Sequence, residues 1–171
     1  EIILINKDGK EIDRLRKETP KNYNGTIDTI CELVNTIENK HKENCKIGIG
    51  TPGALSKETQ CIKGGNSTWL NGRPLKKDLE LRLNRKIFLE NDANCFALSE
   101  AFDGSGFGHE IVFGVIIGTG VGGGLVINKK IIKGHNNITG EWGHNQMTKG
   151  SNDKWNQHEC YCGKKGCIET Y

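Results

Sequence analysis

The chain has 171 residues, of which 35% are hydrophobic and 26% are charged, and its formal net charge is +3. This composition suits one domain of ordinary size with a core of its own. Basic side chains alternate with acidic ones, as in Lys76-Lys77-Asp78, so the basic stripe of nucleic-acid-binding proteins is excluded. No apolar run approaches the length of a membrane span, and the first residues lack a signal-peptide pattern.

The first part of the chain predicts a hairpin, a helix and a buried strand. Residues 1–6 and 11–16 flank an Asp8-Gly9 pair, which is typical of a β-hairpin. From Asn24 to Lys42, apolar side chains recur at three- and four-residue spacing, which indicates an amphipathic helix. The apolar residues 45–50 then predict a buried strand.

The remainder predicts further strands that alternate with helices. A helix follows Pro74, and the other expected elements are a strand at 87–89, a helix from Asp92 to Phe102, strands at 111–117 and 122–127, and a turn at 128–130. We therefore expect an α/β domain with a substantially parallel sheet, made mixed by the opening hairpin. Residues 143–171 are polar, rich in cysteine and aperiodic, so we divide the chain into a lobe of residues 1–142 and a segment of residues 143–171.

Seven cysteines form two groups. Four are scattered and are interpreted as small buried residues: Cys31, Cys45, Cys61 and Cys95. Three crowd one short segment and need a separate explanation: Cys160, Cys162 and Cys167. An odd number argues against a secreted disulfide framework, so we expect a reducing compartment, the cytoplasm.

The crowded cysteines predict a zinc site. Two thiolates one residue apart and a third five residues later, across Gly163 and Gly166, suit a tight loop around a soft cation. Zinc takes four tetrahedral nitrogen or sulfur ligands, so a fourth must come from elsewhere, with His144 favoured over His158. Three free thiols or an iron–sulfur site are the alternatives, and an imidazole with three thiolates fits zinc better.

A glycine-rich turn separates two apolar strands. Gly118-Thr119-Gly120 would let backbone N–H groups approach a phosphate closely. The turn is not a Walker loop, because no Gly-Lys-Ser/Thr follows, and a strand rather than a helix comes next, unlike a dinucleotide fingerprint. A glycine-rich hairpin that merely packs closely is an equally good interpretation.

Polar residues at a strand end form another candidate site. Asn91 and Asp92 lie where a helix begins, a position where ligands bind in open α/β sheets. A carboxylate there can accept a proton from a substrate hydroxyl, although for the pair taken alone an Asn/Asp helix cap is the preferred interpretation. The polar loop at residues 64–72 suits either a polyhydroxyl ligand or a solvated turn.

Together these motifs resemble the ROK family of sugar kinases and repressors. The glycine turn, Asn91-Asp92, Gly-Glu-Trp-Gly-His at 140–144 and Cys-x-Cys-Gly-x-x-Gly-Cys-Ile-Glu at 160–169 occur in the family's order, so the resemblance covers roughly residues 46–171. Residues 66–72 and 160–164 most resemble the bacterial fructokinase or manno-fructokinase members, with N-acetylglucosamine kinases as the near alternative. The resemblance implies an actin-like, ribonuclease-H-like ATPase fold and phosphorylation of fructose to fructose 6-phosphate.

The resemblance also implies roles for individual residues. Asp92 would be the general base that deprotonates the sugar hydroxyl. The positions expected to contact the sugar are Gly53, Asn66, Asn91, Glu141, His144 and Glu169. Gly118, Thr119 and Gly120 would bind the ATP phosphates, and Mg²⁺ would accompany ATP. The zinc ligands would be His144, Cys160, Cys162 and Cys167, so that His144 would serve both the metal and the sugar.

Two departures from the family pattern bear on activity. Family kinases open with a strand that carries Asp-x-Gly-Gly-Thr, and this chain starts just after that point and ends before the second lobe is complete. We therefore expect a fragment that is inactive alone, belonging to a full-length kinase that forms a homodimer. A sugar-responsive ROK repressor and a non-catalytic zinc-stabilised module are the alternatives, and glucose, mannose or an N-acetylhexosamine could replace fructose.

Overall fold

The computed structural model describes residues 1–147 and 158–171, which form two units, residues 1–90 and residues 91–171. Each unit has its own strands and core. The predicted boundary after residue 142 was drawn where the cysteine-rich segment begins, not where one compact unit ends. It stays a prediction.

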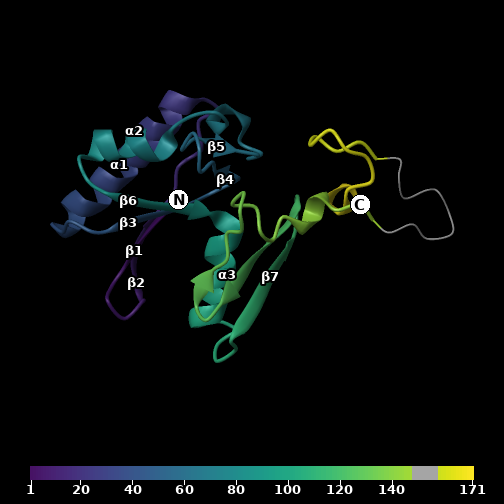
Figure 1. Ribbon diagram of the computed structural model, residues 1–171. Coiled ribbons are helices and arrows are strands. Elements are labelled where there is room, and N and C mark those ends of the chain that lie inside the picture. Colours follow the sequence, from purple (N-terminus) through teal and green to yellow (C-terminus); the bar gives the residue numbers. More distant parts are fainter. Residues whose placement is uncertain (148–157) are drawn as a thin grey trace. The chain divides into compact units, whose positions relative to one another are not determined.

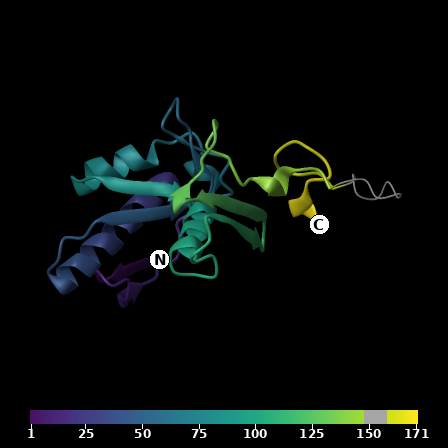
Figure 2. The same cartoon turned by 60° about the horizontal axis from the view of Figure 1, so that its bottom comes forward.

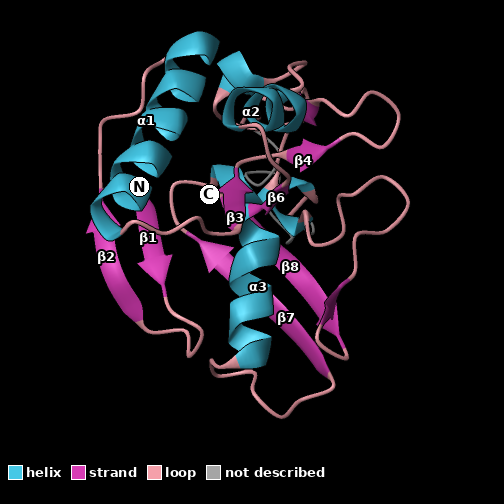
Figure 3. Ribbon diagram, turned by 90° about the vertical axis from the view of Figure 1, so that its left-hand side faces the viewer, coloured by secondary structure: helices cyan, strands magenta, loops and turns pink. Residues whose placement is uncertain are grey.

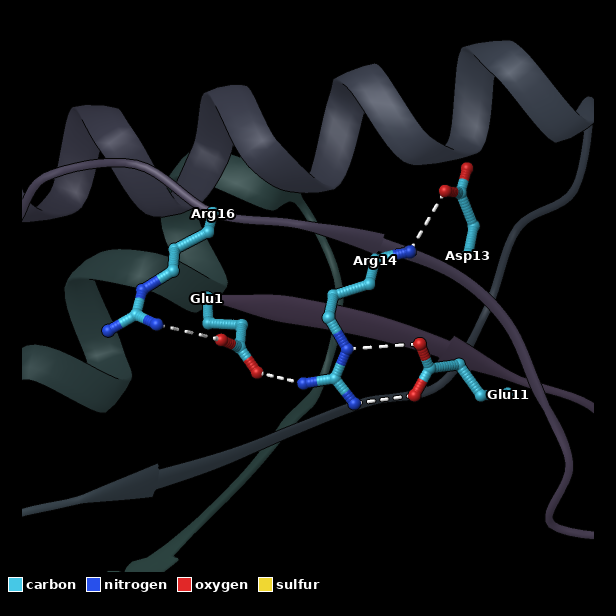
Figure 4. Close-up of polar contacts among 5 residues, drawn as sticks. All are labelled: Glu1, Glu11, Asp13, Arg14 and Arg16. Atoms are coloured by element: carbon cyan, nitrogen blue, oxygen red, sulfur yellow. Dashed lines mark hydrogen bonds and ion pairs between the residues drawn. The ribbon is translucent and has the colours of Figure 1, made fainter.

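The first unit opens with the predicted hairpin. Strands β1 (Ile2–Ile5) and β2 (Glu11–Leu15) pair antiparallel, and the turn between them has Gly9 at a φ of 78°. The Asn6 side chain accepts hydrogen bonds from the backbone of Asp8 and Lys10. Figure 4 shows the Arg14 guanidinium bonded to Glu1 and Glu11, which joins the two strands on their exposed side.

Two helices cover the core of the first unit. Helix α1 (Tyr23–His41) begins at Asn22, whose side chain accepts from the Gly25 N–H, and α2 (Leu75–Leu83) lies beside it (Figure 3). Both helices agree with the predicted periodicity. Their apolar faces meet strands and a short loop in one core, which consists of Tyr23, Ile27, Cys31, Val34, Ile47, Ile62, Leu70, Leu75, Leu79 and Ile87.

The remaining strands of the first unit are short. Strand β3 (Ile47–Thr51) pairs with β6 (Ile87–Asn91), and both match predicted strands. Strands β4 (Ala54–Leu55) and β5 (Ile62–Lys63) form a separate antiparallel pair, and the 3-10 helix η1 spans Thr68–Leu70. These last three elements were not predicted, because two or three residues carry no periodic signal.

The second unit packs one helix on a three-stranded antiparallel sheet. Helix α3 (Asp92–Phe102) runs alongside β7 (Ile111–Ile117) and β8 (Val121–Ile127), as Figure 1 shows, and β9 (Lys130–Ile131) completes the sheet. Gly114 and Gly124 face each other across β7 and β8. A Cβ at either position would lie 2.8 Å from the Ala97 Cβ, so these glycines let α3 approach the sheet.

The chain after β9 folds back on itself. The 3-10 helices η2 (Trp142–His144) and η4 (Ile168–Thr170) are neighbours, and Figure 2 shows residues 158–171, in yellow, beside residues 142–147. Backbone hydrogen bonds of 2.9 Å join Met147 to Gly166 and Ile168 to Asn145. This pairing brings segments that are distant in sequence together.

Some expectations differ from the structure. The β1–β2, β4–β5, β7–β8 and β8–β9 ladders are all antiparallel, so less of the sheet is parallel than the strand–helix alternation led us to expect. Among the scattered cysteines Cys31 is buried, whereas Cys45, Cys61 and Cys95 are half-buried. Within residues 1–147 and 158–171, no helix combines the length and apolarity needed to cross a bilayer.

Candidate functional site

The junction of β6 and α3 holds the predicted general base. Asn91 is the N-cap of α3, and its Oδ1 accepts from the Asn94 N–H at 3.0 Å. Asp92 is the first helical residue and its carboxylate, which accepts from the Ala93 N–H at 2.9 Å, is exposed. The side chain that caps the helix and the exposed carboxylate therefore belong to different residues, Asn91 and Asp92.

Gly118-Thr119-Gly120 forms the exposed loop that joins β7 to β8. The register ends at Ile117 opposite Val121, and the Gly118 N–H donates to the Gly120 carbonyl at 2.9 Å. A Cβ at Gly118 would meet nothing within 4 Å, unlike one at Gly124, which α3 covers. The two interpretations of the glycine run, phosphate binding and close packing, thus apply to different glycines. Gly124 allows close packing against α3, whereas the turn at 118–120 has an accessible backbone.

Helix η2 packs directly on the backbone of β8. A Cβ at Gly143 would lie 2.0 Å from the Val121 carbonyl oxygen, and one at Gly140, whose φ is 95°, would lie 2.4 Å from the Gly123 oxygen. The Trp142 Nε1–H donates to the Gly122 carbonyl at 2.6 Å. The Gly-Glu-Trp-Gly-His motif therefore needs both glycines to hold its polar side chains close to the turn at 118–120.

The predicted metal ligands cluster. The ligand atoms of His144, Cys160, Cys162 and Cys167 all lie within 4.8 Å of one another. The Cys160 Sγ is 3.5 Å from the His144 Nδ1, and the Cys162 and Cys167 sulfurs are 3.6 Å apart. Tetrahedral zinc, with bonds of about 2.3 Å to sulfur and about 2.0 Å to nitrogen, separates its ligand atoms by about 3.5–3.8 Å. These two spacings fit zinc, and His158 lies outside the cluster.

The three thiols of the cluster have shifted pKa values. Burial raises the pKa of Cys160 to about 12 and also raises the pKa of Cys167. A hydrogen bond from the Lys164 backbone lowers the pKa of the exposed Cys162. A soft cation would displace the thiol protons, so its binding would be linked to pH.

Carboxylates gather around the same cluster. The half-buried Glu169 places Oε1 3.2 Å from the Cys160 Sγ, which donates to it, and 3.4 Å from the His144 Nδ1. Its Oε2 lies 3.5 Å from the position of a Cβ on Gly120. Burial raises the pKa of Glu141, and the charges of Asp92 and Glu169 raise it further, whereas His144 lowers it. The second unit therefore brings the predicted base, the sugar-contacting residues of this unit and the glycine turn into one neighbourhood.

The two other predicted sugar contacts belong to the first unit. Gly53 has a φ of 81°, and a Cβ there would lie 2.6 Å from the Gly65 N. Asn66 is exposed in the following loop, and Asn71 braces Gly65 through hydrogen bonds of 3.0 Å and 2.9 Å. Gly53 and Asn66 therefore lie in loops that contact each other.

Sequence reasoning missed one polar neighbour of the metal cluster. The Tyr161 hydroxyl lies 3.3 Å from the His144 Nε2, and the two rings meet edge to face with centroids 5.3 Å apart. The position of Tyr161 between two predicted ligands was the available signal. Its contact with a residue 17 positions away depends on the fold.

Comparison with known proteins gives consistent matches along the chain. A family model described as ROK family matches residues 1–171. The chain is 42% identical over 161 residues to an N-acetyl-D-glucosamine kinase of Salmonella newport (strain SL254), which covers 91% of the chain and 53% of the relative. The chain thus spans about half the length of this relative.

Solved structures of similar proteins are likewise matched over about half of their length. A ROK family glucokinase from Streptomyces griseus, in complex with glucose and AMPPNP, superimposes with a TM-score of 0.82 at 28% identity, over 99% of the chain and 52% of the glucokinase. A ROK hexokinase from Thermus thermophilus gives a TM-score of 0.75 at 30% identity, over 94% of the chain and 51% of the hexokinase.

Proposed function

Because the chain belongs to the ROK family, we propose that the whole protein containing it is an ATP-dependent hexose kinase. The chain has the actin-like ATPase fold of that family, with mixed α/β structure, as the sequence predicted. The observation that carries the proposal is the gathering of Asp92, Glu141, His144 and Glu169 with the exposed turn at 118–120.

We assign the chemical step to Asp92. Its exposed carboxylate accepts the proton of a sugar hydroxyl while that oxygen attacks the γ-phosphorus of ATP. The new oxygen–phosphorus bond forms as the bond from phosphorus to the bridging oxygen breaks, so ADP leaves and the proton stays on Asp92. Positioning supplies most of the rate in phosphoryl transfer, so the placement of the phosphate-binding turn relative to the base would matter.

The ATP phosphates are assigned to Gly118, Thr119 and Gly120. Their exposed backbone allows close approach, and among the described residues a Cβ at Gly118 would meet no atom within 4 Å. Mg²⁺ bound with ATP would neutralise the charge that develops on the transferred group.

The sugar is assigned first to polar residues of the second unit. Glu141, His144 and Glu169 offer polar atoms near the base, and Asn91 would contribute its amide nitrogen because its Oδ1 caps α3. Gly53 and Asn66, which belong to the first unit, remain predicted sugar contacts. Zinc held by His144, Cys160, Cys162 and Cys167 would fix the histidine ring and the segment that carries Glu169.

For the substrate, we propose an aldohexose phosphorylated at its 6-hydroxyl, with N-acetyl-D-glucosamine first. The 42% identical relative is an N-acetyl-D-glucosamine kinase, and the two solved structures are a glucokinase and a hexokinase. These relatives give no support to the fructose preference expected from residues 66–72. Cytoplasmic location, a homodimer and the absence of a nucleic-acid partner also remain predictions.

The test is ADP release by the whole protein with Mg²⁺-ATP and N-acetyl-D-glucosamine, glucose or fructose. We expect sugar-dependent release that is fastest with N-acetyl-D-glucosamine and about 10²- to 10⁴-fold slower in Asp92→Asn. Sugar binding without any ADP release would instead favour a repressor. A higher kcat/KM for fructose than for N-acetyl-D-glucosamine would instead favour the fructose preference expected from residues 66–72.

A further inference from the structure

The two nitrogens of His144 face different partners. Its Nδ1 lies 3.5 Å from the Cys160 Sγ, on the side of the metal cluster. Its Nε2 lies 3.3 Å from the Tyr161 hydroxyl, outside that cluster. The nitrogen that would bind a metal and the nitrogen that would carry the proton are therefore distinguished by the fold.

A metal-bound imidazole needs a partner for its second nitrogen. Neutral histidine has one N–H, so coordination through Nδ1 leaves the proton on Nε2, where it must be donated to an acceptor. Ligating histidines in proteins almost always have such an acceptor, and it fixes both tautomer and ring orientation. A phenolic oxygen can accept that hydrogen bond.

We propose that, in the protein without bound sugar, Tyr161 is a positioning residue for the metal centre, whose hydroxyl accepts the His144 Nε2–H and holds Nδ1 toward the three cysteines. The inference rests on the zinc site of the proposed function and adds a residue to it. Glu169 is a further polar neighbour of this ring, but its Oε1 lies 3.4 Å from Nδ1 and cannot serve Nε2 at the same time.

The hydroxyl can be removed without opening the core. Tyr161 is 71% exposed, so replacement by phenylalanine creates no buried cavity and keeps the edge-to-face ring contact. The same segment offers a matched control. Tyr171 meets the His158 ring edge to face at 4.9 Å, and His158 is not a member of the cluster.

The first experiment measures the zinc affinity of the whole protein by competition with a chromophoric chelator, without sugar or ATP. We expect Tyr161→Phe to weaken zinc binding by about 10- to 100-fold, as loss of an outer partner of a ligand typically does, and Tyr171→Phe to leave it unchanged. Equal affinities in Tyr161→Phe and the wild type would overturn the inference alone. No zinc binding by the wild type would overturn the proposed metal site as well.

The second experiment needs no variant. Nitrogen-15 spectra of the histidine rings in the zinc-loaded whole protein report which His144 nitrogen carries the proton. We expect a protonated Nε2 and a metal-bound Nδ1. The reverse assignment would place the metal where Tyr161 lies and would overturn the inference.

Discussion

Gly143→Ala tests whether the contact between η2 and β8 aligns the proposed site. A Cβ at residue 143 would lie 2.0 Å from the Val121 carbonyl oxygen, whereas real Cβ contacts are not closer than 3.0 Å, so the two backbones must separate by about 1 Å. That shift would move Glu141 and His144 away from the turn at 118–120. A displacement of about 1 Å at a positioned group can lower the rate by about 100-fold.

The assay is kcat/KM of the whole protein for its sugar, with thermal unfolding measured in parallel. We expect a loss of about 100-fold, and overpacking of this kind costs about 1–3 kcal/mol in the free energy of unfolding. The control is Gly48→Ala, because a Cβ there meets nothing within 4 Å. If Gly143→Ala is folded and keeps wild-type kcat/KM, the close contact does not align the site and the reasoning fails.

Three further predictions concern the base, the metal and acid stability. Asp92→Asn should lower kcat by about 10²- to 10⁴-fold yet retain sugar binding by calorimetry, and loss of binding would make Asp92 a binding residue instead. Metal analysis should find one zinc per chain, removed by Cys160→Ser but not by His158→Ala, and unchanged zinc in the cysteine variant would refute the ligand set. The Arg85 guanidinium donates to both oxygens of Glu38 and lowers its pKa. A carboxyl whose pKa is lower in the folded state adds stability above its unfolded pKa of about 4.3, and this stability is lost as the pH falls through the folded value. Arg85→Gln should therefore flatten the acid side of a stability–pH curve, and an unchanged curve would show that the ion pair does not contribute.

The helices were predictable because their signals are local. Apolar side chains at helical spacing placed α1 within one residue of its observed ends, and Asn91 marked the start of α3. Strands β4 and β5 escaped prediction because each has two residues, and only their pairing across a loop makes them strands.

The site was predictable in its residue types but not in its geometry. Spacing alone left His144 and His158 as competing ligands, because the choice depends on backbone pairing that joins residues 145–147 to 166–168. The roles of the glycines likewise depend on the cross-strand register and on where α3 lies. The contact of Tyr161 with His144 arises from the same chain reversal, so a pattern within one segment could not show it.

The most direct test of the proposed kinase is a single coupled measurement of ADP release by the whole protein. With Mg²⁺-ATP present, N-acetyl-D-glucosamine should start ADP release in the wild type, and Asp92→Asn should slow that release by about 10²- to 10⁴-fold while still binding the sugar. ADP release that does not depend on any hexose, or that persists at the wild-type rate in Asp92→Asn, would contradict the assignment of this site to sugar phosphorylation.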